Sequence, residues 1–255
     1  MRLIDEIASR VPIARALPEA FGGAKIYMPA LSLFDEGSGR LEAMHKDLLS
    51  SAMLVAAGQV VWDIGAGIGV FTAAAAMRSG RQGRVIACED VPSNLRLLRK
   101  TVSRLPGDSA RLTLASLVVS QEFGLKSAID TLSETSLGSS NRAYETCSPQ
   151  FSLDWLLDRW PSPNILRLDA RHAHALEQQD RMLTAIRPAI ICALTPEHNS
   201  TLLRVLRSAK YVLYDASQTS TGAFPTDRGA PLTIALPGER QSAMLVCSFS
   251  QNARE

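Results

Sequence analysis

The stretch from Val60 to Thr72, VVWDIGAGIGVFT, decides the fold class of this chain. Its first five residues are an apolar run that predicts a buried strand, and the alanine-rich segment beginning at Val70 predicts a helix. Three alternate glycines, Gly65, Gly67 and Gly69, separate the two. Glycine allows a tight turn and lets a ligand approach the backbone, so this junction predicts a ligand-binding strand–loop–helix unit.

Strand-like and helix-like segments alternate downstream of this junction, which is typical of a parallel α/β sheet. Further strands are expected at 84–89, 111–119, 164–169, 189–194, 211–214 and, as the last strand, 244–249. Helices are expected at 70–78, 92–105, 173–186 and 202–209, and a short amphipathic piece at 152–160. The Ser- and Thr-rich stretch 126–150 is interpreted as an irregular excursion over the sheet.

The N-terminal part reads as a separate cover. Apolar residues recur at helical spacing from Leu3 to Val11, and polar residues interrupt them too often for a signal peptide. We therefore expect a helical N-terminal cover over residues 1–50 and a single main domain over residues 51–255.

Composition excludes several classes of function. Twenty-seven Lys and Arg against 25 Asp and Glu leave a net charge of +2, which argues against nucleic acid as a partner. No run of 18 apolar residues occurs, so no membrane span is expected. The four cysteines are far apart, which argues against a zinc cluster and favours a reducing, cytoplasmic setting. Cys88 and Cys192 are expected in buried strands.

The glycine loop does not fit a dinucleotide site. The spacing G-x-G-x-x-G fails from Gly65, where Val70 stands last, and from Gly67, where Thr72 does. Asp63 would also face a pyrophosphate unfavourably. An acid before alternate glycines suits S-adenosylmethionine, whose methionine part carries an amine and no phosphate. Glu89, at the end of the next strand, can accept both hydroxyls of a ribose. The alternatives are a tight turn without a ligand and a solvated strand-end acid.

Several segments resemble the FkbM-type methyltransferase family. Residues 60–72 are similar to its motif D-[VI]-G-A-N-[IV]-G-x-[FY]-[TS], with Gly67 in place of the Asn. The segment Glu89-Asp-Val-Pro-Ser-Asn94 is similar to E-P-x-P-x-N. Weaker echoes follow in the family's order at 152–156, 187–191 and 210–213.

The resemblance implies a Rossmann-like class I methyltransferase fold over residues 51–255. Such a fold has a mostly parallel seven-stranded sheet, helices on both faces and an antiparallel last strand. It also implies O-methylation of a small molecule or a sugar hydroxyl, with S-adenosyl-L-methionine as cofactor. The residues expected to bind this cofactor are Asp63, Gly65, Ala66, Gly67, Gly69, Phe71, Glu89 and Asp90.

The acceptor half departs from the family. Where the family has a motif like K-I-D-V-E-G-x-E, this chain reads RLDARHAH at 167–174. We hypothesise that His172 or His174 acts as general base and that Asp169 orients it or the acceptor. Arg167 and Arg171, and Asn141 of the Ser-rich stretch, are candidates for binding an anionic acceptor.

Other interpretations stay open. The histidines and arginines can be ordinary surface residues, or His172, His174 and Asp169 can join residues 197–198 in a metal site, although no metal is expected. The chain can also be a catalytically degenerate relative that binds the cofactor and acts through a protein partner. An NAD-type oxidoreductase is a third class. The expected partner is a small-molecule or glycan acceptor, and a homodimer is left open.

Overall fold

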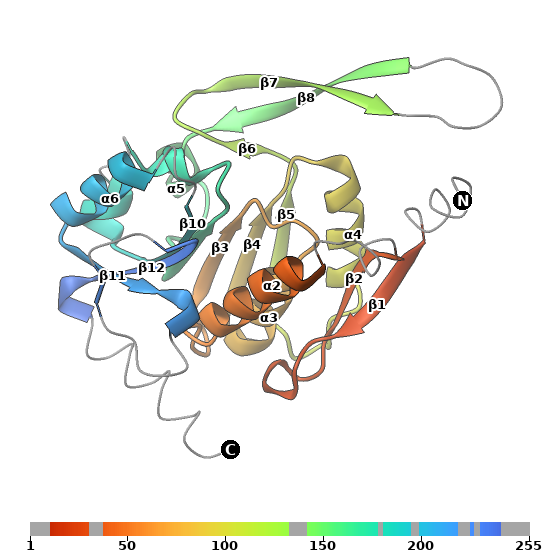
Figure 1. The fold of residues 1–255 in the computed structure, drawn as a ribbon, viewed down its shortest axis with the longest axis horizontal. Coiled ribbons are helices and arrows are strands. Elements are labelled where there is room, and N and C mark those ends of the chain that lie inside the picture. The colour runs from red at the N-terminus through yellow and green to blue at the C-terminus, as the bar shows by residue number, and fades with distance from the viewer. Residues whose placement is uncertain are drawn as a thin grey trace.

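Seven strands form the central sheet in a computed structural model, which describes residues 11–30, 38–132, 142–177, 181–194, 199–218, 225–226 and 230–240 (Figure 1). The strand order is β11-β12-β10-β9-β3-β4-β5. In chain order the strands are β3 (Val60–Ile64), β4 (Arg84–Cys88), β5 (Arg111–Ala115), β9 (Ile165–Leu168), β10 (Ala189–Ala193), β11 (Tyr211–Asp215) and β12 (Leu232–Pro237).

Five of these strands, β10, β9, β3, β4 and β5, run parallel to their neighbours. Strand β12 lies between β10 and β11 and is antiparallel to both. The predicted α/β class and the mostly parallel seven-stranded sheet with an antiparallel strand are therefore confirmed. The antiparallel strand is β12, whereas the strand expected at 244–249 lies outside the described residues.

Helices cover both faces of the sheet because the strands are apolar on both sides. Val61 packs toward α2 (Ser38–Ala52) and α3 (Val70–Ser79), while its neighbour Trp62 packs in a second cluster on the other face. That second cluster includes side chains of α5 (Leu153–Leu157) and α6 (Asn199–Ser208). Cys88 and Cys192 are buried in β4 and β10, as expected. No helix within the described ranges is long and apolar enough to cross a membrane.

The N-terminal cover is helical only in part, so the expectation of a helical cover is wrong for residues 12–29. Strands β1 (Pro12–Ala16) and β2 (Lys25–Pro29) form an antiparallel hairpin, with a short 3-10 turn at Glu19–Phe21. Ile26 and Met28 alternate with more exposed neighbours, which is the burial pattern of a strand. The hairpin lies beside α4 (Pro92–Val102), where the Tyr27 N–H donates to Thr101 Oγ1 at 3.1 Å. Residues 1–10 lie outside the described part.

The Ser- and Thr-rich stretch is not an irregular excursion. It forms β7 (Gly124–Leu132) and β8 (Arg142–Phe151), which pair antiparallel, and β8 also pairs with β6 (Val118–Val119). Figure 1 shows this long hairpin extending away from the central sheet. The sequence of this stretch shows little apolar alternation, which is the signal by which a strand is usually predicted.

The prediction of a helix at 173–186 is also wrong. Ala173–Leu176 is a 3-10 turn and Arg181–Ile186 is a separate wide turn of π-helical type. The chain must first turn back sharply from the end of β9, where the His172 N–H donates to the Asp169 carbonyl and side chain. A tight turn at that point takes the place of the first turns of a regular helix. Short 3-10 turns at Ala216–Gln218 and Gly238–Arg240 complete the described elements.

Candidate functional site

The glycine loop lies between β3 and α3 and is held against β4. Its three alternate glycines have positive φ angles, +75° at Gly65, +59° at Gly67 and +94° at Gly69. The N–H groups of Gly65 and Ala66 both donate to the Cys88 carbonyl at 2.9 Å. Residues with side chains rarely adopt these angles, so the backbone explains why glycine stands at each position.

Glu89 follows β4 and is tied to the same loop. Its side chain is fully buried, Oε2 accepts the Gly67 N–H at 2.6 Å, and Oε1 accepts the Val91 N–H at 2.8 Å. A carboxylate has about four lone-pair positions, so these bonds leave Glu89 able to accept further donors. Glu89 thus lies against the glycine loop, and its contact with a ribose stays a prediction.

Asp63 forms a buried ion pair with Arg167. The two residues are neighbours in register on β3 and β9, and Arg167 Nη1 donates to Asp63 Oδ1 at 3.0 Å. The Thr72 hydroxyl donates to the other Asp63 oxygen at 2.5 Å. Both Asp63 oxygens thus accept hydrogen bonds from protein groups, and the carboxylate faces the interior. Its contact with a ligand amine stays a prediction.

Asp169 is the carboxylate that lies over the glycine loop. A Cβ placed on Gly65 would come within 2.3 Å of Asp169 Cγ, so the close approach requires a glycine. Asp169 Oδ1 contacts His172 Nδ1 at 2.5 Å, and Oδ2 accepts from Arg171 Nε at 3.0 Å. Burial raises the pKa of Asp169, but the bond to His172 and the charges of His172, Arg167 and Arg171 outweigh it and lower this pKa to about 2.

The structure brings Asp169 and His172 together, as the base hypothesis requires, but it places them unequally. The His172 side chain is 3% exposed and that of Asp169 is 18% exposed. Asp169 is therefore the more accessible member of the pair, with His172 behind it. His174 lies in the following 3-10 turn, where its carbonyl accepts from Gln121 Nε2 at 2.8 Å. Asn141 and residues 197–198 lie outside the described residues.

Replacing Asp169 with asparagine should destabilise the protein in a pH-dependent way. A carboxyl with a pKa of about 2 in the folded chain and 3.8 as its ordinary value stabilises the fold above pH 3.8. That contribution, about 2 kcal/mol, is lost as pH falls from about 4 toward 2. Urea unfolding of wild type and Asp169→Asn should therefore differ at pH 7 and converge near pH 2.

The matched control is Asp158→Asn, which removes an exposed carboxylate paired with Arg181. Its effect on the free energy of unfolding should be small and almost independent of pH. A difference for Asp169→Asn that is equally large at pH 7 and near pH 2 would contradict the assigned role of the carboxylate charge.

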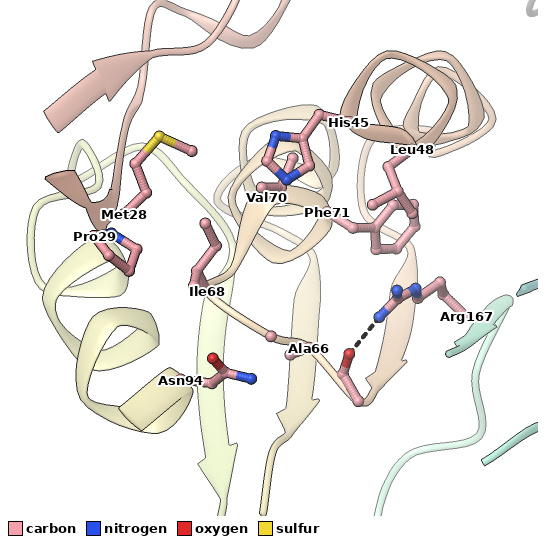
Figure 2. A pocket seen from close by; sticks show the side chains of 12 residues that line it. Met28, Pro29, His45, Leu48, Ala66, Ile68, Val70, Phe71, Asn94 and Arg167 are labelled. Atoms are coloured by element: carbon pink, nitrogen blue, oxygen red, sulfur yellow. Dashed lines mark hydrogen bonds between the residues drawn. The ribbon is translucent and has the colours of Figure 1, made fainter. Parts of the chain in front are cut away.

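A pocket of about 320 Å³ opens on the helix side of the glycine loop (Figure 2). Sequence reasoning selected Arg167, Gly65, Ala66, Gly67 and Phe71 of its lining, and missed the contribution of the N-terminal cover. The residues that it did not select are Met28, Pro29, His45, Leu48, Ile68, Val70 and Asn94. Asn94 belongs to the E-x-x-P-x-N segment, which is the one signal that marked it. Ile68 and Val70 belong to the loop and to the start of α3, whereas the residues of β2 and α2 reach the pocket only because these two elements pack beside the loop.

Arg167 and the amino end of α3 give this pocket a positive side. Figure 2 shows the Arg167 guanidinium directed at the Gly65 carbonyl, to which Nη1 donates at 2.6 Å. Arg167 Nε is buried and has no hydrogen-bond partner among the described residues. The amino end of α3 also faces the pocket, because Val70 and Phe71 line it and Gly69 provides no side-chain cap. A helix amino end and a guanidinium favour an anionic group.

The described part of the chain contains no group of three or more His, Cys, Asp or Glu side chains placed to hold a metal ion. The carboxylates of Glu89, Asp90 and Asp169 are all close to the Arg171 guanidinium, which serves as their positive partner.

No protein-family model matches the sequence, and no curated protein matches it. Similar solved structures include a precorrin-6y C5,15-methyltransferase from Geobacter metallireducens, at 18% identity over 74% of this chain and 86% of that chain, TM-score 0.43. An S-adenosylmethionine-dependent O-methyltransferase from Thermotoga maritima has 16% identity over 75% of this chain and 65% of that chain, with a TM-score of 0.43. A putative rRNA methylase from Clostridium thermocellum has 15% identity over 76% of this chain and 92% of that chain, with a TM-score of 0.44. These likenesses assign no substrate to this chain.

Proposed function

We propose that this protein is an S-adenosylmethionine-dependent methyltransferase that methylates an oxygen of a small molecule or a sugar. One observation carries the proposal: the glycine loop, the buried Glu89 and the pocket form one connected site at the end of the parallel strands. Gly67 of the glycine loop connects the other two, because it lines the pocket and its N–H donates to Glu89 Oε2 at 2.6 Å. Ligands of open α/β sheets bind at this end of the strands.

In this proposal each part of the cofactor has a chemically suitable place. The ribose hydroxyls donate to Glu89, which has only acceptor atoms. The methionine part enters the pocket, where its chain contacts Leu48 and Phe71 and its carboxylate faces Arg167 and the amino end of α3. The amine and the sulfonium are positive, and Asp169 is the carboxylate over the loop that can face them.

The residues on the acceptor side have two tasks, which are to orient the acceptor hydroxyl and to remove its proton. A hydroxyl acceptor must lie in line with the methyl group and lose its proton. Asp169, held by His172 and Arg171, is the partly exposed acid at that position. We assign His172 to hold Asp169 in place, and either Asp169 or His174 to contact the acceptor. When bound, the cofactor supplies the electrophilic methyl group.

Binding tests the cofactor assignment. We expect S-adenosylhomocysteine to bind in isothermal titration calorimetry and to raise the melting temperature, whereas NAD should do neither. Glu89→Gln should weaken binding by about 10- to 100-fold, because it removes a charged acceptor of hydrogen bonds. Glu122→Gln changes an exposed glutamate outside the site and should leave the affinity unchanged. Tighter binding of NAD than of S-adenosylhomocysteine would contradict the assignment.

Product detection tests the reaction. The protein is incubated with S-adenosylmethionine carrying a deuterated methyl group and with a panel of metabolite and glycan extracts. A product heavier by one labelled methyl group, found by mass spectrometry and absent with Glu89→Gln, would support the proposed reaction. Cofactor binding without any labelled product across the panel would favour the degenerate relative that acts through a partner.

A further inference from the structure

Arg171 lies over the acids at the ends of β4 and β9. Its Nη2 is 3.6 Å from Glu89 Oε1, its Nη1 is 3.2 Å from Asp90 Oδ1, and its Nε donates to Asp169 Oδ2 at 3.0 Å. One guanidinium thus contacts three carboxylates from two strand ends. The Arg171 side chain is 43% exposed, whereas that of Glu89 is fully buried.

This arrangement conflicts with a ribose on Glu89. The Val91 N–H and the guanidinium lie at Oε1, and the Gly67 N–H takes a position on Oε2. A diol that donates to both oxygens of Glu89 needs the place that Arg171 Nη2 occupies. With the guanidinium in this position the Glu89 side chain is fully buried.

We propose that Arg171 is an internal competitor of the cofactor, a strap that the ribose must displace from Glu89 and Asp90. This inference rests on the proposed function. The strap can open without leaving the site, because Nε is bound to Asp169 of the same turn while the two terminal nitrogens reach across to the end of β4. Any fraction of molecules with the strap closed lowers the apparent affinity in proportion.

The strap predicts that shortening Arg171 strengthens cofactor binding. Calorimetric titration with S-adenosylhomocysteine should give a Kd about three- to tenfold lower for Arg171→Gln than for wild type, since partly exposed ion pairs are individually weak. Arg171→Lys keeps the charge without the fork, so its Kd should fall between the two. Arg181→Gln removes another exposed arginine, paired only with Asp158 among the ion pairs described, and should bind like wild type.

Salt gives a second readout that a purely structural role would not produce. Screening weakens the contacts of Arg171, so raising the salt should narrow the difference in Kd between wild type and Arg171→Gln. Unchanged or weaker binding by folded Arg171→Gln would overturn the strap and leave the proposed function standing. If Arg171→Gln does not fold, Arg171→Lys decides in the same way. Failure of every variant and of wild type to bind would overturn the proposed function together with the strap.

Discussion

Replacing Arg167 with methionine is expected to lower the free energy of unfolding by about 3–5 kcal/mol, because it leaves a buried carboxylate without its counter-charge. Asp63 is 0% exposed, and the Arg167 side chain is 9% exposed. Methionine fills much of the same volume but cannot donate to Asp63 or to the Gly65 carbonyl, both of which accept from Nη1. Urea unfolding followed by circular dichroism measures the loss.

The double variant Asp63→Asn with Arg167→Met tests the cause. Asparagine removes the buried charge and its amide oxygen can still accept from Thr72, so most of the loss should be recovered. Arg181→Met breaks an exposed pair and should cost no more than about 1 kcal/mol. If the double variant is as unstable as the sum of its single changes, the loss comes from packing and not from an unpaired charge.

Replacing Gly65 with alanine should damage both the fold and the site. The residue has φ of +75°, and its Cβ would lie 2.3 Å from Asp169 Cγ. Backbone strain and the displacement of Asp169 should together cost about 2–5 kcal/mol of stability. Asp169 cannot yield easily, since His172 and Arg171 hold both its oxygens. Where the variant stays folded, binding of S-adenosylhomocysteine should be lost within the range of calorimetry.

Gly23→Ala is the matched control for this variant. Gly23 has φ of +60° and open space where a Cβ would stand, and it lies outside the glycine loop. Its cost should be the backbone strain alone, about 1–2 kcal/mol, with binding retained. Equal effects of Gly65→Ala and Gly23→Ala on stability and on binding would contradict the close packing of Asp169 on the loop.

Local patterns predicted the parts of the fold in which one segment carries its own signal. Val60–Ile64 was predicted as a strand with the bounds that the structure has, and the helix from Val70 ends one residue later than predicted. Both segments are strongly apolar, and glycines with positive φ separate them. Such a junction is determined by neighbours in sequence, so a single sequence suffices.

The wrong predictions concern segments whose structure depends on pairing with another strand. The β7–β8 hairpin and the β1–β2 hairpin are stabilised by pairing between strands, and neither shows a clear apolar alternation over its whole length. Strand β12 was not predicted, because its place between β10 and β11 depends on contacts across the sheet. Pairing of this kind leaves little trace in one strand's own residues.

By itself the sequence determined the strand–glycine–helix junction, the alternation of strands and helices, and the candidate acids at 63, 89 and 169, since each depends on spacing along the chain. Only the tertiary structure decided what those acids do. Register places Arg167 beside Asp63 and turns that acid inward, while the tight turn after β9 lays Asp169 on Gly65. The same turn brings Arg171 to Glu89, 82 positions away along the chain. The interaction between two charges depends on the distance between them in space, and the sequence of one strand does not give its distance from another strand.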